Sequence, residues 1–273
     1  MFFEFAKMHG LGNDFVIADA SFFEGRDLCA DAVAVCDRHR GVGADGLILF
    51  GMEGGTPFMR LWNSDGSRAK MCGNGIRCLA RLLFERGLSK SPGFVISTDS
   101  GPRSVFVDEK SGDVGVDMGN PDFLPANVPV SAEGDSFVEG EIESGGRIWR
   151  VTAVSMGNPH AVIFVDSLDD SLLSFGAGIE RHPIFPDGVN VEFVKAVDPR
   201  RLRVLVWERG AGPTMACGTG ACAAYAVACR LGKCTLYADV ELPGGVLRIS
   251  TGNSGSVQMR GPAVKSFEGR MEI

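Results

Sequence analysis

Two stretches of the chain carry apolar residues at helical spacing, and each begins where a cysteine precedes a glycine-rich turn. The first is predicted to run from about Gly75 to Arg86 and to stop at a glycine. The second is predicted over about Gly220 to Leu231 and also stops at a glycine. Its segment from Ala221 to Val227 is apolar nearly all round, which is typical of a helix enclosed by a sheet rather than lying on one.

Short segments in which apolar residues dominate or alternate with polar ones predict strands in both halves of the chain. Further helices are expected near Leu28–Arg38 and Leu172–Arg181. The strands are expected at Phe15–Ala18, Leu47–Phe50, Phe94–Thr98, Ala161–Val165, Val191–Val194 and Leu202–Trp207. The pattern therefore predicts a mixed α/β (α+β) chain.

The sequence matches itself when it is shifted by 145 residues, without a gap over about seventy-five positions. One constant offset over that length indicates two homologous halves. The matched positions are Gly12-Asn13 with Gly157-Asn158, Gly43 with Gly188, Asp45 with Asn190, Asn63 with Glu208, Cys72-Gly73 with Cys217-Gly218, Gly75 with Gly220 and Gly87 with Gly232.

The boundary between the halves is expected near Gly119-Asn120-Pro121, where strand-like alternation gives way to turn residues. The segment Val264–Ile273 follows the end of the second copy, so we expect it to return and complete the first sheet. This predicts one domain of residues 1–118 plus 264–273 and a second domain of residues 119–263.

Composition excludes several classes of protein. The net charge of −7 disfavours binding to nucleic acid, because phosphates would be repelled. The longest apolar stretch, Ala221–Cys229, is far below the roughly 20 residues needed to span a bilayer. The first ten residues lack the basic head and apolar core of a signal peptide. A cytoplasmic protein without a membrane or nucleic-acid partner is expected.

The eight cysteines are sparse, and most lie within apolar helical patterns, so reduced thiols are expected rather than a disulfide scaffold. Six of them are interpreted as core or incidental residues: Cys29, Cys36, Cys78, Cys222, Cys229 and Cys234. The other two, Cys72 and Cys217, each stand directly before a Gly-x-Gly turn that opens a helix.

A thiol at the first turn of a helix is well placed for chemistry. Unpaired N–H groups and the helix dipole favour an anion there, so we expect both thiols to have a lowered pKa. The glycines of both turns also allow a substrate carboxylate to approach the backbone donors. Two such thiols related by a repeat form a symmetric acid/base pair, which is what inversion at an α-carbon requires. The developing enolate charge would be stabilised without a metal.

Three other roles for the two cysteines are weighed. They could be buried structural thiols, although a core cysteine needs no following Gly-x-Gly. A zinc site would have to combine Cys72, Cys78, Cys217 and Cys222, whose spacings of Cys-x5-Cys and Cys-x4-Cys lack a short knuckle. A redox dithiol would normally show Cys-x-x-Cys, which is absent from the sequence.

Several motifs together resemble the diaminopimelate epimerase family over essentially the whole chain. Proline racemases and phenazine-pathway isomerases share its fold but are not expected to carry this full set. The motifs are Met8-His9-Gly10-Leu11-Gly12-Asn13-Asp14-Phe15, Asn63-Ser64-Asp65-Gly66-Ser67, Met71-Cys72-Gly73-Asn74-Gly75, Met156-Gly157-Asn158-Pro159-His160, Asn190-Val191, Glu208-Arg209-Gly210 and Ala216-Cys217-Gly218-Thr219-Gly220.

The resemblance implies two pseudo-symmetric domains, each a curled, mostly antiparallel sheet around a central helix, with the active site in the cleft between them. It implies a homodimer that interconverts LL- and meso-diaminopimelate, without cofactor or metal, for lysine and peptidoglycan precursor synthesis. Cys72 and Cys217 would be the acid/base thiols. His160 would tune Cys72, and Glu208 would tune Cys217.

The resemblance also implies a set of substrate contacts. Arg209 suits the distal carboxylate through a bidentate fork, and Glu208 suits the distal ammonium. Some family members carry a glutamine that contacts substrate where this chain has Gly46, which would offer only its backbone. The remaining contacts would come from Asn13, Asn63, Asn158 and Asn190, with Gly73-Asn74 and Gly218-Thr219 holding the reacting carboxylate.

Two alternative functions remain open at this point. A related cofactor-independent isomerase would act on another amino acid, such as proline or hydroxyproline, and a panel of substrates would reveal it. A non-catalytic amino-acid-binding protein would need no activated thiols. It would leave the α-hydrogen of its ligand unexchanged in deuterated water.

Overall fold

The computed structural model describes residues 2–273, which form two compact units. One unit comprises residues 2–117 and Arg260–Ile273, and the other comprises Met118–Met259. The sequence predicts domain boundaries after residues 118 and 263. The compact units of the structure divide after Asp117 and after Met259.

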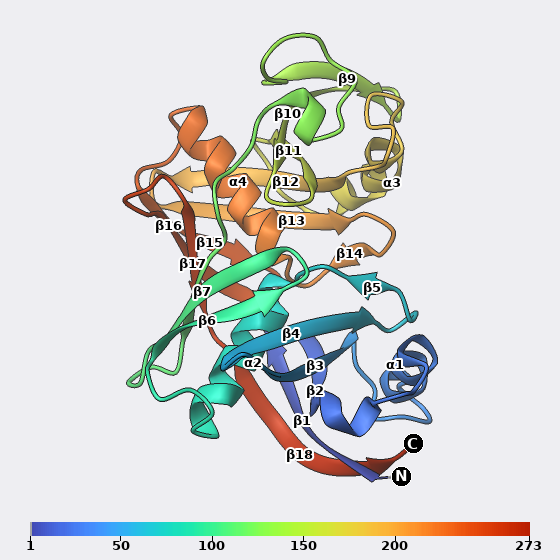
Figure 1. The fold of residues 1–273 in the computed structure, drawn as a ribbon. Coiled ribbons are helices and arrows are strands. Elements are labelled where there is room, and N and C mark those ends of the chain that lie inside the picture. The colour runs from blue at the N-terminus through green and yellow to red at the C-terminus, as the bar shows by residue number, and fades with distance from the viewer. Residues whose placement is uncertain (1) are drawn as a thin grey trace. The chain divides into compact units, whose positions relative to one another are not determined.

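The first unit contains a 13-residue helix, α2, among strands and one shorter helix. Its last strand, β18, is contributed by the C-terminal segment and lies beside β1 (Figure 1). Its elements are β1 (Phe2–Gly10), β2 (Asn13–Asp19), η1 (Ala20–Phe23), α1 (Leu28–Cys36), β3 (Gly46–Glu53), β4 (Thr56–Asn63), β5 (Arg68–Ala69), α2 (Gly73–Glu85), β6 (Gly93–Thr98), β7 (Gly101–Val107), β8 (Val114–Asp117) and β18 (Val264–Glu272).

The second unit repeats this order around α4, which is also 13 residues long. Its elements are η2 (Pro125–Asn127), β9 (Gly140–Ser144), β10 (Arg147–Ser155), β11 (Pro159–Phe164), η3 (Asp170–Phe175), α3 (Gly176–Glu180), β12 (Asn190–Asp198), β13 (Arg201–Glu208), β14 (Gly212–Thr214), α4 (Gly218–Arg230), β15 (Tyr237–Leu242) and β16 (Gly245–Thr251). Strand β17 (Val257–Gly261) follows.

Strand pairing is the same in both units. In the first, β18, β1, β2, β3, β4, β6, β7 and β8 follow one another, and the β2–β3 and β4–β6 pairs are parallel. In the second, β9, β10, β11, β12, β13, β15 and β16 follow one another, with parallel pairs at β11–β12 and β13–β15. The remaining pairs in these two series are antiparallel. The shift of 145 residues that relates the sequences also carries β4 onto β13 and α2 onto α4.

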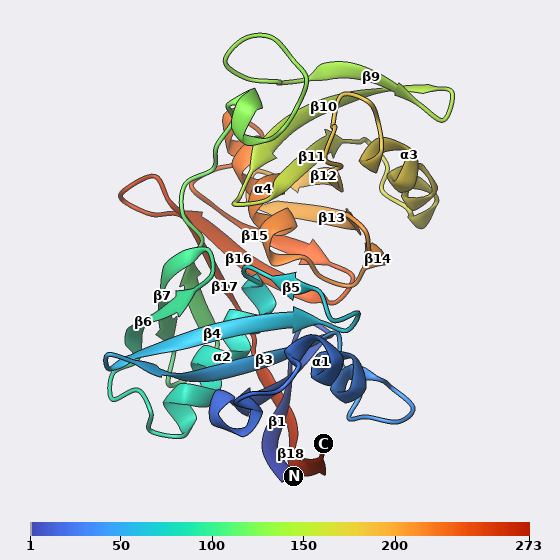
Figure 2. The same cartoon turned by 45° about the vertical axis from the view of Figure 1, so that its right-hand side comes forward.

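Each central helix packs against the strands of its own unit (Figures 1 and 2). Helix α2 contacts β1, β2, β3, β7 and β8, and α4 contacts β10, β11, β12, β13, β15 and β16. Residues 220–228 of α4 are all buried, as its apolar sequence predicts. Among residues 2–273, no helix combines the length and apolar character that a membrane crossing requires.

Both helices begin two residues earlier than the sequence predicts, at Gly73 and Gly218. Each Gly-x-Gly segment therefore forms the first helical turn instead of a loop before it. Cys72 and Cys217 consequently occupy the N-cap positions. The sequence predicts one helix at Leu172–Arg181. The structure instead has a 3-10 helix, η3, followed by the short helix α3.

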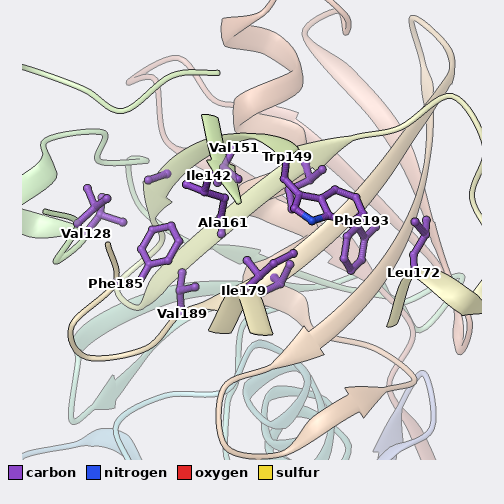
Figure 3. Close-up of a cluster of buried hydrophobic side chains, with 14 of the residues drawn as sticks. Val128, Ile142, Trp149, Val151, Ala161, Leu172, Ile179, Phe185, Val189 and Phe193 are labelled. Carbon is purple, nitrogen blue, oxygen red and sulfur yellow. The ribbon is translucent and has the colours of Figure 1, made fainter. Parts of the chain in front are cut away.

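Strands β11 and β12 separate an apolar core from the α4 side of the second unit. Ala161 and Phe193 belong to the apolar core, where Phe193 and Trp149 lie edge to face with ring centroids 5.5 Å apart (Figure 3). Side chains alternate along a strand, so those of His160 and Glu192 project to the opposite face. On that face Glu192 lies against Gly220 of α4.

Candidate active site

In the first unit, the Cys72 thiol caps the N-terminus of α2. The N–H of Gly75 donates to Cys72 Sγ at 3.5 Å, and Sγ lies 3.7 Å from Asn13 Oδ1. Cys72 is partly exposed. The thiol predicted to be reactive is therefore accessible, and it is held between a helix N-terminus and a side-chain amide.

Asn13 is fixed by polar contacts on both sides of its amide. Asn74 Nδ2 donates to Asn13 Oδ1 at 3.2 Å, and Asn13 Nδ2 donates to Asp45 Oδ2 at 2.8 Å. The first unit therefore brings Cys72, Asn13 and Asn74 together, as a shared site requires. Asp45 was not among the predicted site residues, although the repeat pairs it with Asn190 and so offered a signal.

A buried arginine that the sequence analysis did not identify supports this turn. Arg77 is fully buried, and its guanidinium donates to Asn74 Oδ1 at 2.9 Å, to Gly73 O at 3.1 Å and to Pro262 O at 3.3 Å. Its sequence signal is a single basic residue within the mostly apolar first half of the helix. Arg77 thereby ties the glycine turn and Asn74 to the returning C-terminal segment.

Gly46 and Asn63 are direct partners across β3 and β4. Gly46 is buried, and a Cβ placed there would lie 2.8 Å from Trp62 O, so the backbone leaves no space for a side chain. Asn63 is exposed at the end of β4, and its Nδ2 donates to Ser67 Oγ at 2.9 Å. A substrate contact from either residue stays a prediction.

In the second unit, the Cys217 thiol is only 6% exposed at the N-cap of α4. Its Sγ lies 3.4 Å from Thr219 Oγ1. Burial raises the Cys217 pKa well above its ordinary value, and the charges of Glu208 and Glu192 raise it further, against a smaller lowering by Thr219. The expectation of a lowered pKa is therefore wrong for Cys217. Loss of solvent and two nearby carboxylates outweigh the helix N-terminus.

Glu208 lies at the end of β13 and faces Cys217. Burial raises the pKa of Glu208, while hydrogen bonds from Thr214 and Cys217 oppose this shift. Thr214 Oγ1 donates to Glu208 Oε1 at 2.6 Å. The structure thus brings Glu208 to the thiol that the resemblance assigns to it.

His160 is completely buried between two side chains of its own unit. Its Nδ1 lies 2.7 Å from Glu192 Oε1, and its Nε2 lies 3.0 Å from Asn158 Oδ1. Its tuning of Cys72 stays a prediction. Glu192 was missed because a single glutamate in a β-branched and aromatic strand carries no motif.

Asn190 and Arg209 are linked through the backbone. Asn190 is 5% exposed, its Nδ2 donates to Pro159 O at 2.9 Å, and its Oδ1 accepts from the N–H of Arg209 at 2.9 Å. The exposed Arg209 guanidinium donates to Asp187 O at 3.0 Å. Asn190 thus orients the segment from which Arg209 reaches outward, and direct contact of either with substrate stays a prediction.

Each unit therefore presents one thiol at the first turn of its central helix, beside glycine N–H groups and a hydrogen-bonded asparagine. A thiol can exchange a proton with carbon, and the N–H groups suit an adjacent carboxylate. Within residues 2–273, no cluster of three or more His, Cys, Asp or Glu side chains has an arrangement suited to a metal ion.

Comparison with known proteins gives full-length relatives. The family model described as diaminopimelate epimerase matches residues 5–124 and 152–266. The diaminopimelate epimerase of Synechococcus elongatus is 47% identical over 279 aligned positions, covering 100% of this chain and 99% of the relative. That of Acetivibrio thermocellus is 42% identical, covering 98% of each chain.

Solved structures share the fold at much lower identity. A phenazine biosynthesis protein of the PhzF family from Bacillus anthracis superimposes with a TM-score of 0.72 at 15% identity, covering 100% of both chains. A hydroxyproline epimerase from Agrobacterium vitis gives a TM-score of 0.70 at 15% identity, covering 99% of this chain and 91% of the other. At these identities the similarity shows the fold alone.

Proposed function

The chain belongs to the diaminopimelate epimerase family, and we propose that it interconverts LL- and meso-diaminopimelate by a two-base mechanism. The observation that carries this proposal is the repeated placement of Cys72 and Cys217. Each is the N-cap of a central helix that begins with Gly-x-Gly, at equivalent positions of two homologous units. Inversion of an α-carbon needs an acid and a base on opposite faces, and two thiols at equivalent positions of the repeat can supply them.

The proton movements follow from the two thiols. In one direction a thiolate Sγ removes the α-proton, and the other Sγ–H delivers a proton to the opposite face of the carbon. In the reverse direction the roles exchange. Since the pKa of Cys217 is raised, this residue is a thiol in the free enzyme. It is therefore the acid in the direction that starts from this state. Cys72 then starts as the base.

The reacting carboxylate would be bound by the first turns of the central helices. There the backbone N–H groups of Gly73-Asn74 and Gly218-Thr219 would stabilise the charge that develops when the α-proton leaves. Asn13 and Asn158, which occupy equivalent positions in the two units, would flank this carboxylate. Neutral amides can fix its orientation without adding charge.

The distal end of the substrate carries a second carboxylate and a second ammonium group. Arg209 is exposed, and its guanidinium can take the carboxylate through two parallel hydrogen bonds. Glu208 would take the ammonium, with further contacts from Asn63, Asn190 and the Gly46 backbone. This set distinguishes diaminopimelate from amino acids that lack a charged distal end.

The wider context is part of the same proposal. The domains would be residues 1–118 with 264–273 and residues 119–263, each contributing one of the two acid/base thiols. The protein would act as a cytoplasmic homodimer, without a cofactor, in lysine and peptidoglycan precursor synthesis. The full-length matches to diaminopimelate epimerases support the assignment of the reaction.

Incubation with LL-diaminopimelate in deuterated water, under reducing conditions, tests the function. We expect meso product to form with deuterium at the inverted α-carbon, detected by NMR and mass spectrometry. Proline and hydroxyproline, assayed in parallel, should not exchange. Exchange of either of these without exchange of diaminopimelate would assign the chain to another substrate. No exchange with any of the three, by protein whose thiols are shown to be free, would overturn catalysis altogether.

A further inference from the structure

A continuous series of side-chain hydrogen bonds joins Cys217 to a buried carboxylate. Cys217 Sγ lies 3.4 Å from Thr219 Oγ1, which accepts from Asn158 Nδ2 at 3.3 Å. Asn158 Oδ1 lies 3.0 Å from His160 Nε2. The series ends where His160 Nδ1 meets Glu192 Oε1 at 2.7 Å.

The carboxylate at the end of this series is in an energetically unfavourable place. Glu192 and His160 are both 0% exposed. Glu192 Oε2 has no hydrogen-bond partner among the described residues. Burying an ionisable group with an unsatisfied oxygen costs stability, and apolar residues of similar volume are often as stable or more so. Packing alone therefore gives no reason for a glutamate here.

The first unit shows that the fold does not need this pair. At the positions that the 145-residue shift relates to His160 and Glu192, the first unit has Phe15 and Leu47, which are 3% and 0% exposed. Both units nevertheless have an asparagine and a cysteine at equivalent positions of the repeat. The titratable pair is thus specific to the half that contains Cys217.

The first turn of α4 has room for the carboxylate only because residue 220 is glycine. A Cβ on Gly220 would lie 2.6 Å from Glu192 Oε1 and 3.3 Å from the Cys217 Cβ. Glu192 thus lies directly beneath the turn that carries the thiol. A negative charge is favoured at that end of a helix.

The hydrogen bonds allow two consistent directions. In one, His160 Nε2–H donates to Asn158, Asn158 Nδ2–H donates to Thr219, and the Thr219 hydroxyl donates to a Cys217 thiolate. In the other, the amide is turned, each bond runs from the Cys217 thiol back toward Nε2, and the proton that Nε2 carries in the first direction lies on Sγ. In both directions the His160 Nδ1–H points at Glu192, which therefore fixes the ring while the rest of the series reverses.

We propose that Glu192 is a positioning residue for proton transfer at Cys217, acting through His160, Asn158 and Thr219. This inference rests on the proposed function, because it assigns Cys217 the acid/base role. The titratable groups near Cys217 come from three strands: the charges of Glu192 on β12 and Glu208 on β13 act on it, and His160 on β11 is joined to it through Asn158 and Thr219. The Glu192 charge raises the Cys217 pKa, as that of Glu208 does, but Glu192 is also joined to the thiol by the series of hydrogen bonds.

The first experiment measures Cys217 without any substrate. The alkylation rate of Cys217 by iodoacetamide is followed against pH, by mass spectrometry of its peptide. Glu192→Gln removes a charge that raises the Cys217 pKa, so its midpoint should move to lower pH. Glu192→Asp keeps the charge and should stay near the parental midpoint. Asp31→Asn, at a buried carboxylate of the first unit, is the control for a general loss of a buried charge.

The second experiment tests the route through Thr219 by a double-mutant cycle. Glu192→Gln alone should lower kcat by at least about tenfold with KM little changed, since it disturbs proton transfer and no substrate contact. Thr219→Val breaks the series at the thiol. In that background Glu192→Gln should lower kcat much less, so the two effects are not additive.

If Glu192→Gln does not fold, the double variant His160→Phe with Glu192→Leu is used in the same measurements. The first unit has phenylalanine and leucine at the two equivalent positions, and both are buried there. The double variant should fold, and its Cys217 midpoint should also move to lower pH. An unchanged midpoint in the variant that folds, or additive effects on kcat, would overturn the inference. Failure of the parent to turn over diaminopimelate would instead overturn the proposed function, and the alkylation measurement would be unaffected by it.

Discussion

The Glu208 carboxylate lies close enough to Cys217 for its charge to raise the pKa of the thiol, and burial raises the pKa values of both groups. Each therefore favours its protonated state more than it would in water. At the position of β4 that the repeat matches to Glu208, the first unit has Asn63, whose side chain is a neutral amide. The two thiols are equivalent in backbone position but not in electrostatic surroundings.

Removing either thiol should stop epimerisation. We expect Cys72→Ala and Cys217→Ala each to lower kcat by roughly 10²–10⁴-fold or more, because one face of the α-carbon then lacks an acid/base group. Cys→Ser at either position should leave weak activity at most, since a hydroxyl is a much weaker acid than a thiol. Coupled assay of meso product checks this, and Cys29→Ala, at an exposed cysteine, serves as the control. Turnover near the parental rate by either alanine variant would contradict the two-base mechanism.

Neutralising Glu208 should make Cys217 more acidic. In Glu208→Gln the negative charge that raises the Cys217 pKa is lost, so the thiol should ionise at lower pH. The basic limb of the pH–kcat profile should move to lower pH in the direction that uses Cys217 as the acid. Thr214→Val, which removes a neutral hydrogen bond to Glu208, should cause a smaller change. A basic limb unmoved by Glu208→Gln would mean that Cys217 is not the group that titrates there.

Arg209→Lys should weaken substrate binding while leaving the thiols intact. Lysine keeps the charge but lacks the planar fork, and losing a hydrogen bond to a charged group costs about 1.5–3 kcal/mol, or roughly tenfold to a hundredfold in KM. Arg203→Lys, at an exposed position of β13, is the matched control. Equal KM values for the Arg209 variant and the parent would show that another residue holds the distal carboxylate.

Gly46→Ala should destabilise the first unit. Its new Cβ would lie 2.8 Å from a backbone oxygen, which cannot move without disturbing β4, so we expect a loss of about 1–3 kcal/mol in the free energy of unfolding. Gly93→Ala is the control, because this strand glycine has its nearest neighbour 3.7 Å from the added Cβ. Urea unfolding of both variants makes the comparison. Equal losses would refute the steric account of Gly46.

Stability should fall at alkaline pH because of buried thiols. Burial raises the pKa of Cys36 and of Cys78 from 9.0 to about 12, so each stays protonated in the folded chain while it ionises in the unfolded chain. Their stabilising effect is complete below pH 9 and is lost as the pH rises toward 12, at about 1.4 kcal/mol per pH unit for each thiol. Urea unfolding between about pH 8 and pH 10 should show this slope. Cys36→Ala with Cys78→Ala should make it shallower, whatever their effect at neutral pH.

Much of the fold could be predicted from local patterns. The apolar run of α4, the glycines that end both helices and the alternating segments of β2, β3, β11 and β12 are readable because neighbours in sequence decide them. The repeat was readable for the same reason. Glycine positions such as Gly73 and Gly218 reflect a turn that each unit must form by itself.

The candidate site could be predicted where a residue belongs to a short motif. Cys72, Cys217, Asn13 and Asn158 stand beside glycines that mark a turn, and the structure places each at or next to a helix or strand end. Arg77 and Glu192 were missed because each is a charged residue inside an apolar segment. Only the packing of that segment against a neighbour shows what the charge contacts.

The sequence by itself determined that two equivalent thiols stand at the first turns of two helices. Tertiary structure alone decided their electrostatic character. The Cys217 pKa is raised because β12 and β13 bring Glu192 and Glu208 to the N-terminus of α4. Those carboxylates come from positions 25 and 9 residues before the thiol, counted along the sequence. Local helix geometry favours a thiolate, whereas burial and long-range strand pairing favour the thiol, and only the folded chain shows which effect is larger.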